Sequence, residues 1–399
     1  MRTAGQTKRR IAAATALVAL SIAGTAQAAA PDRVAPLYET RGAIADQYIV
    51  TLEGSLPAKP TKRSERAAST EARRVASSVN ATPDYVYDSA IKGFAADLTR
   101  VQVRRLRHSA QVKYVEQDAR VQLSATQIHA PWHLDRIDQR ALPLSTTYEH
   151  SKSGAGVHAF IIDTGLQSHH PDFTHRAHNG YDALQGDGSD CHGHGTHVAG
   201  IIGGDKYGVA KHVKLIGVRV LGCSGSGTHS ATIAGVNWVA AHHLAGKSVA
   251  NLSLGGGVSP SVDDAVSKLI HSGVFVSVAA GNSNANACNY SPARVPAAFT
   301  TAASDSTDAK ASFSNFGPCV DGYAPGAGVI SDWTGSTTRL ESGTSMAAPM
   351  VAGTAALYLS HHAGTPHTIS HWLKEHATPG VIRNNPLDTA NLLLYKAGL

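Results

Sequence analysis

Short, nearly uninterrupted apolar runs dominate the chain from residue 157 onward and alternate with longer segments of helical pattern. The runs with the length of buried strands lie at 157–162, 214–221, 248–254 and 274–280. Helical segments lie between them at 230–245 and 262–271. Strands that are apolar throughout and separated by helices form a parallel sheet with helices on both faces. We therefore expect an α/β domain whose ligands bind beyond the carboxyl ends of the strands.

A second constraint comes from the stretch Glu341–Pro349, where Ser345 stands among small residues before the apolar run 350–357. That run predicts a buried helix, and the free N–H groups at a helix N-terminus favour developing negative charge. Ser345 is therefore a candidate nucleophile. Serine is also a favoured helix N-cap, so the stretch alone leaves a plain capping role open. The choice depends on finding a base and an orienting acid elsewhere.

Candidates for both lie at strand ends or helix starts. Asp163 follows the run 157–162, His194 stands in the glycine-rich segment 190–200, and Asn282 follows a strand end. Acyl transfer by a serine needs a base, an acid that fixes the base's tautomer, and donors for the oxyanion. An Asx-turn at Asp163 and a plain turn at Asn282 remain alternatives.

The histidines around His194 allow a metal reading. His194 and His197 are three residues apart and, with His192, could form a zinc cluster on one helix face. The sequence has no H-E-x-x-H pattern, and we interpret the glycines beside His194 as room for a close substrate. We make the same interpretation of Gly343 and Ala347. The nucleophile hypothesis is therefore favoured.

Three motifs resemble the signatures of the subtilisin-like serine proteases. They are Asp163-Thr164-Gly165, His194-Gly195-Thr196-His197 and Gly343-Thr344-Ser345-Met346-Ala347-Ala348-Pro349. The order Asp, His, Ser is that of subtilisin itself. Segments 130–139 and 251–256 are similar to the proteinase K branch, and within it to the secreted bacterial aqualysin type. The resemblance covers residues 125–399 and implies a subtilisin-like doubly wound, mostly parallel sheet.

The resemblance also implies roles for single residues. Ser345 would attack the scissile carbonyl, His194 would act as base and then acid, and Asp163 would orient His194. The side-chain amide of Asn282 and the N–H of Ser345 would form the oxyanion hole. His197 is assigned to packing.

Substrate binding is expected as an added strand between two edge segments. Main-chain pairing of that kind predicts broad specificity. By resemblance, the edges and the S1 pocket comprise Ser224, Gly225, Ser226, Ser253, Leu254, Gly255, Ala279, Ala280 and Gly281. His229 is expected at the rim, and the small groups predict room for an apolar or aromatic side chain.

The first 124 residues have a different organisation. A basic flank, a short apolar core and Ala26-Gln27-Ala28 predict a secretory signal peptide at 1–30. Residues 31–124 have the order β-α-β-β-α-β of a small ferredoxin-like α+β unit. That unit could be a binding module, but its position before a larger domain favours a pro-segment, and it resembles the inhibitor-like propeptide of the family. We expect cleavage near Ser124–Ala125 and the catalytic domain at 125–399.

The charge distribution excludes one class of partner. The formal net charge is +6, but the first 124 residues carry +8 and the remainder −2. The basic excess lies in the part expected to be removed, so we do not expect nucleic-acid binding. No further apolar run is long enough to span a membrane, so a secreted, soluble monomer is expected once the signal is cleaved.

The chain has four cysteines, and export to an oxidising compartment favours disulfides. Four cysteines allow three connectivities. Nearness in sequence and the aqualysin-type spacing both favour Cys191–Cys223 and Cys288–Cys319. Cys191 as a catalytic thiol is the alternative, but it lies outside the nucleophile motif.

Structural calcium is implied by the resemblance alone. Asp321 with the carbonyl groups of Pro296 and Ala298 matches one calcium site of the branch. Asp135, Asp138 and Gln139 resemble part of a second, whose further ligands are replaced by Ser145 and Thr147. No catalytic cofactor is expected.

The sequence therefore predicts a secreted serine endopeptidase that is made as a self-processing zymogen. Its propeptide would act as intramolecular chaperone and inhibitor. Two alternatives are a catalytically silent binding protein on the same fold and a serine hydrolase that acts on esters.

Overall fold

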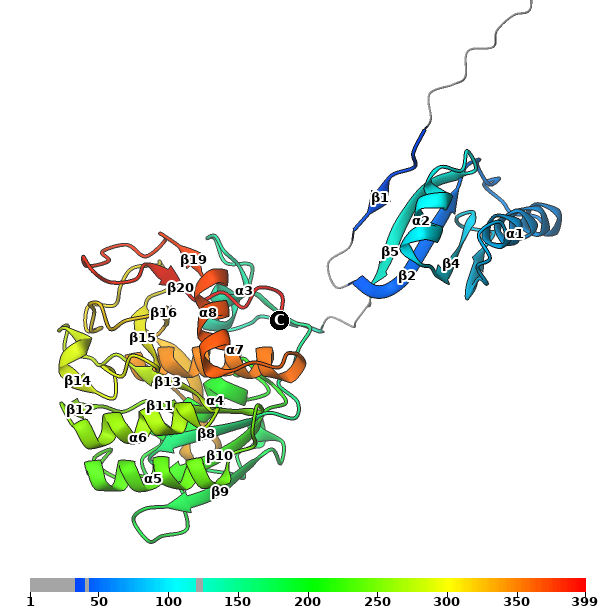
Figure 1. Cartoon of the computed structure of the whole chain (residues 1–399). Helices are drawn as coiled ribbons and strands as arrows, with labels where there is room; N and C mark the ends of the chain where they lie inside the picture. Colours follow the sequence, from blue (N-terminus) through cyan, green and yellow to red (C-terminus); the bar gives the residue numbers. More distant parts are fainter. Residues whose placement is uncertain (1–32, 40–42, 120–124) are drawn as a thin grey trace, which may run out of the picture. The chain divides into compact units, whose positions relative to one another are not determined.

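The computed structural model describes residues 33–39, 43–119 and 125–399. The predicted signal peptide and Ser124, on one side of the predicted cleavage point, lie outside these residues. The chain divides into two compact units, Met1–Val121 and Gln122–Leu399, and each is described separately (Figure 1). No helix in the described ranges is long and apolar enough to cross a membrane.

The described residues of the smaller unit form one five-stranded sheet and two helices. Its elements are β1 (Leu37–Tyr38), β2 (Ala43–Leu52), α1 (Lys62–Ser77), β3 (Tyr85–Tyr87), β4 (Gly93–Asp97), α2 (Arg100–Arg107) and β5 (Val112–Ala119). The strand order is β1-β5-β2-β4-β3. Both helices begin with a capping box, Thr61 with Ser64 and Thr99 with Gln102. From β2 to β5 the elements follow the expected ferredoxin-like order, and β1 is a short addition that the sequence did not indicate.

The larger unit is built on a nine-stranded sheet ordered β19-β20-β16-β15-β13-β11-β8-β10-β9. The elements that form the sheet are β8 (His158–Asp163), β9 (Ala177–Asp182), β10 (Lys214–Arg219), β11 (Ser248–Leu252), β13 (Phe275–Ala279), β15 (Phe299–Ser304), β16 (Gly322–Pro325), β19 (Thr378–Pro379) and β20 (Leu392–Leu393). Every pairing from β9 to β20 is parallel, and only β19 pairs antiparallel. The expected mostly parallel sheet is confirmed.

Helices cover both faces of this sheet. They are α3 (Trp132–Asp138), α4 (His194–Gly203), α5 (His229–His242), α6 (Pro260–His271), α7 (Thr344–His361) and α8 (Pro366–His376). Alternate residues of β8 point to opposite cores: Ala159 and Ile161 pack with α4 and α7, whereas Phe160 and Ile162 pack with α5 and α6. This two-sided burial explains why the strands are apolar throughout.

Small elements complete the unit. Two-stranded pairs form between β6 (Ala125–Ile128) and β7 (Thr147–His150), β12 (Gly256–Gly257) and β14 (Tyr290–Ser291), and β17 (Val329–Trp333) and β18 (Thr337–Glu341). Three 3₁₀ turns occur at Pro171–Phe173, Ala287–Asn289 and Thr334–Ser336. The β17–β18 hairpin leads directly into α7 and thereby fixes where that helix begins.

Candidate active site

Asp163 and His194 meet where the carboxyl end of β8 faces the N-terminus of α4. The Nδ1 atom of His194 lies 2.7 Å from Oδ1 of Asp163. Asp163 is completely buried, and the same oxygen accepts the N–H of Thr164 at 2.7 Å. Because an ionised carboxylate can only accept, Nδ1 of His194 carries the proton and Nε2 is left as a base.

The charges around His194 set its proton affinity. Burial alone lowers the pKa of the imidazole, because it penalises the charged form. The charge and hydrogen bond of Asp163, with Asp190 and Glu341 further away, outweigh burial, so the pKa of His194 is raised above its ordinary value. The site therefore stabilises an imidazolium, which a general base becomes after it takes a proton.

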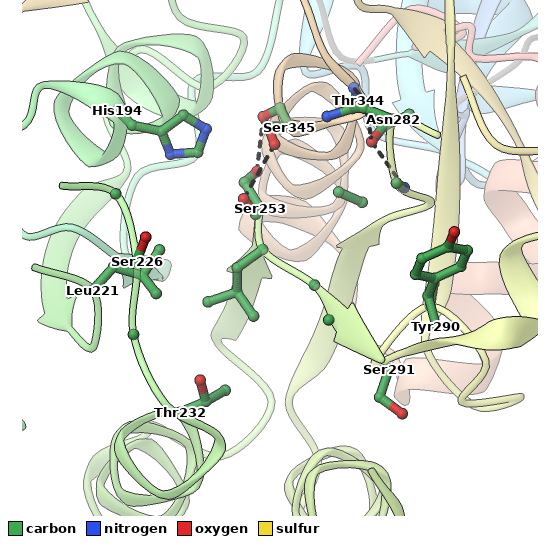
Figure 2. A pocket seen from close by; sticks show the side chains of 18 of the residues that line it. His194, Leu221, Ser226, Thr232, Ser253, Asn282, Tyr290, Ser291, Thr344 and Ser345 are labelled. Carbon is green, nitrogen blue, oxygen red and sulfur yellow. Dashed lines mark hydrogen bonds between the residues drawn. The ribbon is translucent and has the colours of Figure 1, made fainter. Parts of the chain in front are cut away.

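Ser345 is the second residue of α7 and lies in its first turn. Its hydroxyl donates to the carbonyl oxygen of Ser253 at 3.1 Å, and Ser253 Oγ donates to the carbonyl oxygen of Ser345 at 2.7 Å. Figure 2 shows Ser345 and His194 entering the same pocket from different helices. The hydroxyl thus contacts Ser253 here, and contacts between a nucleophile and its base often tighten only when substrate binds.

The orientation of the Asn282 amide follows from its two neighbours. The backbone N–H and the hydroxyl of Thr344 donate to Asn282 Oδ1 at 2.8 and 2.9 Å. A backbone N–H can only donate, so this atom must be the amide oxygen, and Nδ2 keeps its protons for another acceptor. Asn282 lines the same pocket as Ser345 (Figure 2). The structure therefore supplies a free amide donor beside the serine.

Asn315 holds the loop that carries Asn282, a role the sequence analysis missed. Its Nδ2 donates to the carbonyl of Ala280 at 2.8 Å, and its Oδ1 accepts the N–H groups of Ser283 and Ala285. A Cβ on Gly281 would lie 2.4 Å from Asn315 Nδ2, and Gly281 has φ +102°. Only glycine fits there. Asn315 is 35 residues from Ala280 and carries no local signal, so tertiary structure alone reveals it.

Asp190 organises the loop before His194 and was also missed. Its Oδ1 accepts the N–H groups of His192 and Gly193, and its Oδ2 accepts the N–H and hydroxyl of Thr196. These bonds satisfy N–H groups that a helix N-terminus otherwise leaves without partners. The polar residue in front of a glycine-rich helix start was the available signal.

The small residues near the site serve packing rather than substrate approach, which corrects our interpretation. A Cβ on Gly193 would lie 2.2 Å from the indole of Trp333, and one on Gly195 would lie 2.2 Å from the Gly165 carbonyl oxygen. Ala347 is completely buried in the core between α7 and the sheet. The contacts of Gly343 differ, because a Cβ there would lie 3.3 Å from Asn282 Nδ2. That glycine keeps the amide donor accessible.

A cleft of about 680 Å³ contains His194, Asn282 and Ser345. All nine residues predicted for the edges and the S1 pocket line it, and His229 does too. Lining residues that the sequence analysis did not assign include Leu221, Thr232, Val262, Tyr290, Ser291 and Ala293. The cleft is lined by no Asp, Glu, Lys or Arg of the described chain. Such walls fit an uncharged extended peptide.

Both disulfides have the pairing given by the resemblance. Cys191–Cys223 joins the loop of His194 to the edge segment at 224–227, with 5.0 Å between the Cα atoms. Cys288–Cys319 joins two loops near Asn315, with a Cα separation of 5.4 Å. Each closes a loop of 31 or 32 residues, which the chain-entropy treatment values at about 3.5 kcal/mol. The first bridge also excludes Cys191 as a free thiol.

The three clustered histidines have separate partners, which argues against a shared zinc ion. His194 contacts Asp163, whereas the Nε2 of His197 lies 3.0 Å from the Arg339 carbonyl oxygen. Burial lowers the pKa of His197 to about 4, so it stays neutral in the core. No group of three His, Cys, Asp or Glu side chains in the described ranges could hold a metal ion.

The first predicted calcium position already contains an internal cation. Asp321 Oδ1 pairs with the ammonium of Lys374 at 2.5 Å, and its Oδ2 accepts the N–H of Thr300. Burial raises the pKa of Asp321, while Lys374 opposes that shift. Calcium needs six to eight oxygen ligands, and the single carboxylate of the predicted set is already paired with Lys374. These residues do not fit an added calcium ion.

At the second predicted calcium position, the side-chain oxygens also have protein donors. Asp135 accepts backbone N–H groups from Ser145 and Thr146. Asp138 pairs with Lys396 at 2.7 Å, and its other oxygen accepts the N–H of Glu149. Gln139 Oε1 accepts the N–H of Ser145 as well. All these oxygens have protein donors, so this set does not fit calcium either.

Comparisons with known proteins agree with this geometry. The profile of the Subtilase family matches residues 154–393, and that of Peptidase inhibitor I9 matches residues 47–124. The chain is 46% identical to an extracellular serine proteinase of Thermus sp. (strain Rt41A) over 95% of this chain and 97% of the relative. It is 42% identical to proteinase R of Parengyodontium album over 90% and 92%.

A solved structure gives the same answer. The crystal structure of a cold adapted subtilisin-like serine proteinase has a TM-score of 0.66 and 51% identity, and it covers 67% of this chain and 98% of its own. The fold, the site geometry and the length of these matches lead to one conclusion: the chain belongs to the subtilase family of serine proteases.

Proposed function

We propose that the protein is a secreted, self-processing serine endopeptidase in which Asp163, His194 and Ser345 form the catalytic triad. The observation that carries this proposal is the 2.7 Å contact between Asp163 and His194 beside a serine at a helix N-terminus in the same cleft. Secretion is supported by the signal-like N-terminus and by the similarity to the extracellular serine proteinase of Thermus sp. (strain Rt41A).

The chemistry follows from the positions of the polar atoms. Ser345 Oγ attacks the scissile carbonyl carbon while His194 Nε2 takes the hydroxyl proton, and Asp163 stabilises the resulting imidazolium. The carbonyl oxygen becomes an oxyanion that accepts from Asn282 Nδ2 and from the N–H of Ser345. Collapse expels the amine, which receives the proton from His194. Water then attacks the acyl-enzyme by the same route, releases the acid and restores Ser345.

Peptide substrate is expected to pair with two edges of the cleft. The segment 224–227 is held as a tight hairpin, because Gly222 N–H donates to the Ser226 carbonyl at 2.8 Å. Ser253, Leu254 and Gly255 form the opposite edge. Backbone pairing with both edges favours peptides over simple esters and reads few side chains. Specificity is therefore expected to be broad.

The first unit is proposed as an inhibitory propeptide at 31–124, cleaved near Ser124–Ala125. The Peptidase inhibitor I9 match over residues 47–124 supports this role. Protein substrates and this propeptide are the proposed partners, with the catalytic domain at 125–399 acting as a monomer. Because lysine ammonium groups pair with Asp321 and Asp138 at the two predicted calcium positions, the proposal includes no metal, and it includes no catalytic cofactor.

Expression of wild type, Ser345→Ala and Ser342→Ala tests the proposal. Ser342 is a matched control, because it stands three residues earlier and its hydroxyl accepts the N–H of Gly328 outside the cleft. Wild type and Ser342→Ala should lose their first unit and hydrolyse casein, whereas Ser345→Ala should remain full length and inactive. Equal maturation of Ser345→Ala would contradict self-processing. Ester hydrolysis without casein hydrolysis would favour the esterase alternative, and no hydrolysis by any form would favour a silent binding protein.

A further inference from the structure

The cleft holds an imidazole that the proposed mechanism does not use. His192 is half-buried, lines the cleft, and lies two residues before His194. Its ring centroid is 6.3 Å from that of His194 and 6.2 Å from that of Trp333. The indole of Trp333 thus limits the movement of His192 on one side.

The nitrogen atoms of His192 have different neighbours. The backbone N–H of His194 donates to His192 Nδ1 at 3.3 Å. Since that N–H can only donate, the neutral ring must be unprotonated at Nδ1 and carry its proton on Nε2. Nε2 lies against the edge segment, where a Cβ on Gly225 would be 3.0 Å away.

The accepted N–H is the first of helix α4. The N-cap residue of α4 is Gly193, which has no side chain to cap it. The N–H groups of His192 and Gly193 are held by Asp190, whereas the N–H of His194 donates to His192. His192 therefore caps the helix at the residue that supplies the base.

We propose that His192 is a positioning residue for His194 and that protonation of its ring, which removes the acceptor for the His194 N–H, reduces the reaction rate. This inference rests on the proposed function of His194 as general base. A proton on Nδ1 would set two N–H groups against each other and remove the acceptor. It would also add positive charge at the positive end of the α4 dipole, beside the imidazolium that forms during catalysis.

The charged groups around His192 come from several elements. Asp190 accepts the backbone N–H of His192, and Asp163 and Glu341 act on the neighbouring His194. Arg339 stacks on Trp333 at 4.5 Å, and Arg219 contacts the sulfur of Cys191 at 3.2 Å. The adjacent cleft wall contributes no acidic or basic side chain apart from histidine to the described lining. Acidic and basic side chains thus both lie around His192. The feature that differs between its neutral and its protonated ring is the hydrogen bond from the N–H of His194.

Two substitutions separate the loss of the hydrogen-bond acceptor at position 192 from the gain of a proton there. His192→Asn retains an oxygen acceptor but cannot gain a proton near neutral pH, and His192→Leu removes both functions. Each variant is expressed with its propeptide, and its active sites are titrated with a serine-directed acylating reagent. The turnover of a chromogenic peptide is then measured from pH 5 to 10, and each profile is normalised to its own alkaline plateau.

We expect the plateau kcat of His192→Leu to be about fivefold below that of His192→Asn, the factor for one lost hydrogen bond. At the acidic end of the range, wild type should keep a smaller fraction of its plateau than His192→Asn, while the two variants should have the same normalised profile. Superimposable profiles of wild type and His192→Asn would overturn the proton-sensitive role. Equal plateaus for the two variants, or an effect on KM alone, would overturn the positioning role.

The result is separable from the proposed function. If wild type shows no hydrolysis that depends on Ser345, the proposed function fails before His192 is considered. If His192→Leu does not mature, the comparison of wild type with His192→Asn still decides the proton-sensitive role. A His192→Leu variant that fails to mature while His192→Asn matures supports the positioning role.

Discussion

Asp163 and Asp332 are both completely buried in the larger unit, yet their surroundings differ in one essential respect. Asp163 contacts an imidazole that can become a cation, and the pKa of that imidazole is raised. Asp332 lies 3.6 Å from His170, which burial keeps neutral by lowering its pKa. A buried carboxylate thus becomes useful for catalysis only when its neighbour can accept a proton.

The surroundings of Asp332 also include a second acid. Neither oxygen of Asp332 has a hydrogen-bond donor among the residues that the structure describes, and a Cβ on Gly204 would meet both Asp172 and Asp332. Burial first, and then the charge and contact of Asp172, raise the pKa of Asp332 to about 9. His170 cannot help, because its Nδ1 accepts the N–H of Asp172. The comparison therefore sets a functional buried carboxylate against a buried acid that stays neutral and destabilises the fold when it ionises.

The largest expected effect is that of replacing Asp163 by asparagine, and the same replacement at Asp332 is its control. Asp163→Asn should lower kcat by about 10⁴-fold, because a neutral amide neither fixes the tautomer of His194 nor stabilises its imidazolium. Asp163 raises the pKa of His194, so its removal should also move the acid limb of activity to lower pH. Steady-state kinetics on a peptide substrate measure both. Asp332→Asn is the control and should keep wild-type turnover; a similar loss in both variants would remove the distinction.

Asn282→Leu extends this comparison to a different polar group. Within the described part of the chain, Asn282 presents an amide donor without a partner, whereas Asp332 is an acid without one. The amide oxygen is held by Thr344, so Nδ2 has its partner only when an oxyanion forms. We expect kcat to fall about 10²–10³-fold with little change in KM. Thr344→Val is a second variant that removes one of the two donors to the amide oxygen and leaves the backbone N–H of residue 344 in place, so it should give a smaller loss. A change in KM alone would show that Asn282 binds ground-state substrate.

The next effect concerns stability instead of rate. In the folded state Asp332 is protonated up to about pH 9, whereas in the unfolded chain it ionises near the ordinary aspartate pKa of 3.8. Unfolding therefore releases a proton between these values, so stability falls as pH rises from about 4 to 9 and levels off above. Asp332→Asn should raise the free energy of unfolding by roughly 1–3 kcal/mol, most at pH 9.

Urea unfolding of enzyme inactivated by a serine-directed reagent, at pH 5, 7 and 9, measures this gain. Asp172→Asn serves as the matched variant, because it removes the neighbouring charge and leaves Asp332 in place. A gain that does not increase with pH would show that Asp332 is not protonated in the folded protein.

The sequence predicted the sheet, its covering helices and the positions of the candidate site residues because these depend on local signals. Apolar runs mark strands buried on both faces, and polar residues at their ends mark the site, as for Asp163 after 157–162. The partners that hold the site were not predictable in this way. Asn315 with Gly281, and Trp333 with Gly193, are distant in sequence and meet only through the register of the fold. Their sequence contexts resemble ordinary loops.

The lysine partners at the two predicted calcium positions could not be predicted for a related reason. Motif residues such as Asp321 and Asp138 are present, but the two lysines that neutralise them come from the C-terminal part of the chain. Lys374 lies on α8, and Lys396 lies near the last residue. A comparison of local motifs does not include a cation that lies so far along the chain.

The smallest expected effect is that of calcium on thermal stability, and it follows from these aspartate–lysine pairs. They add a third kind of aspartate to the comparison. Asp321 has a built-in cation, unlike Asp332, and that cation is not part of a reaction, unlike the partner of Asp163. Because the oxygens are occupied, exchanging calcium for a chelator should change the Tm of inactivated enzyme by less than about 2 °C. Lys374→Met should lower Tm and should restore a calcium-dependent rise, since the Asp321 carboxylate then lacks its ammonium. Differential scanning calorimetry with millimolar calcium or chelator gives both values, and Lys374→Met with Asp321→Asn should abolish the rise. A large loss of Tm in wild type on chelation would mean that calcium displaces one of these lysines.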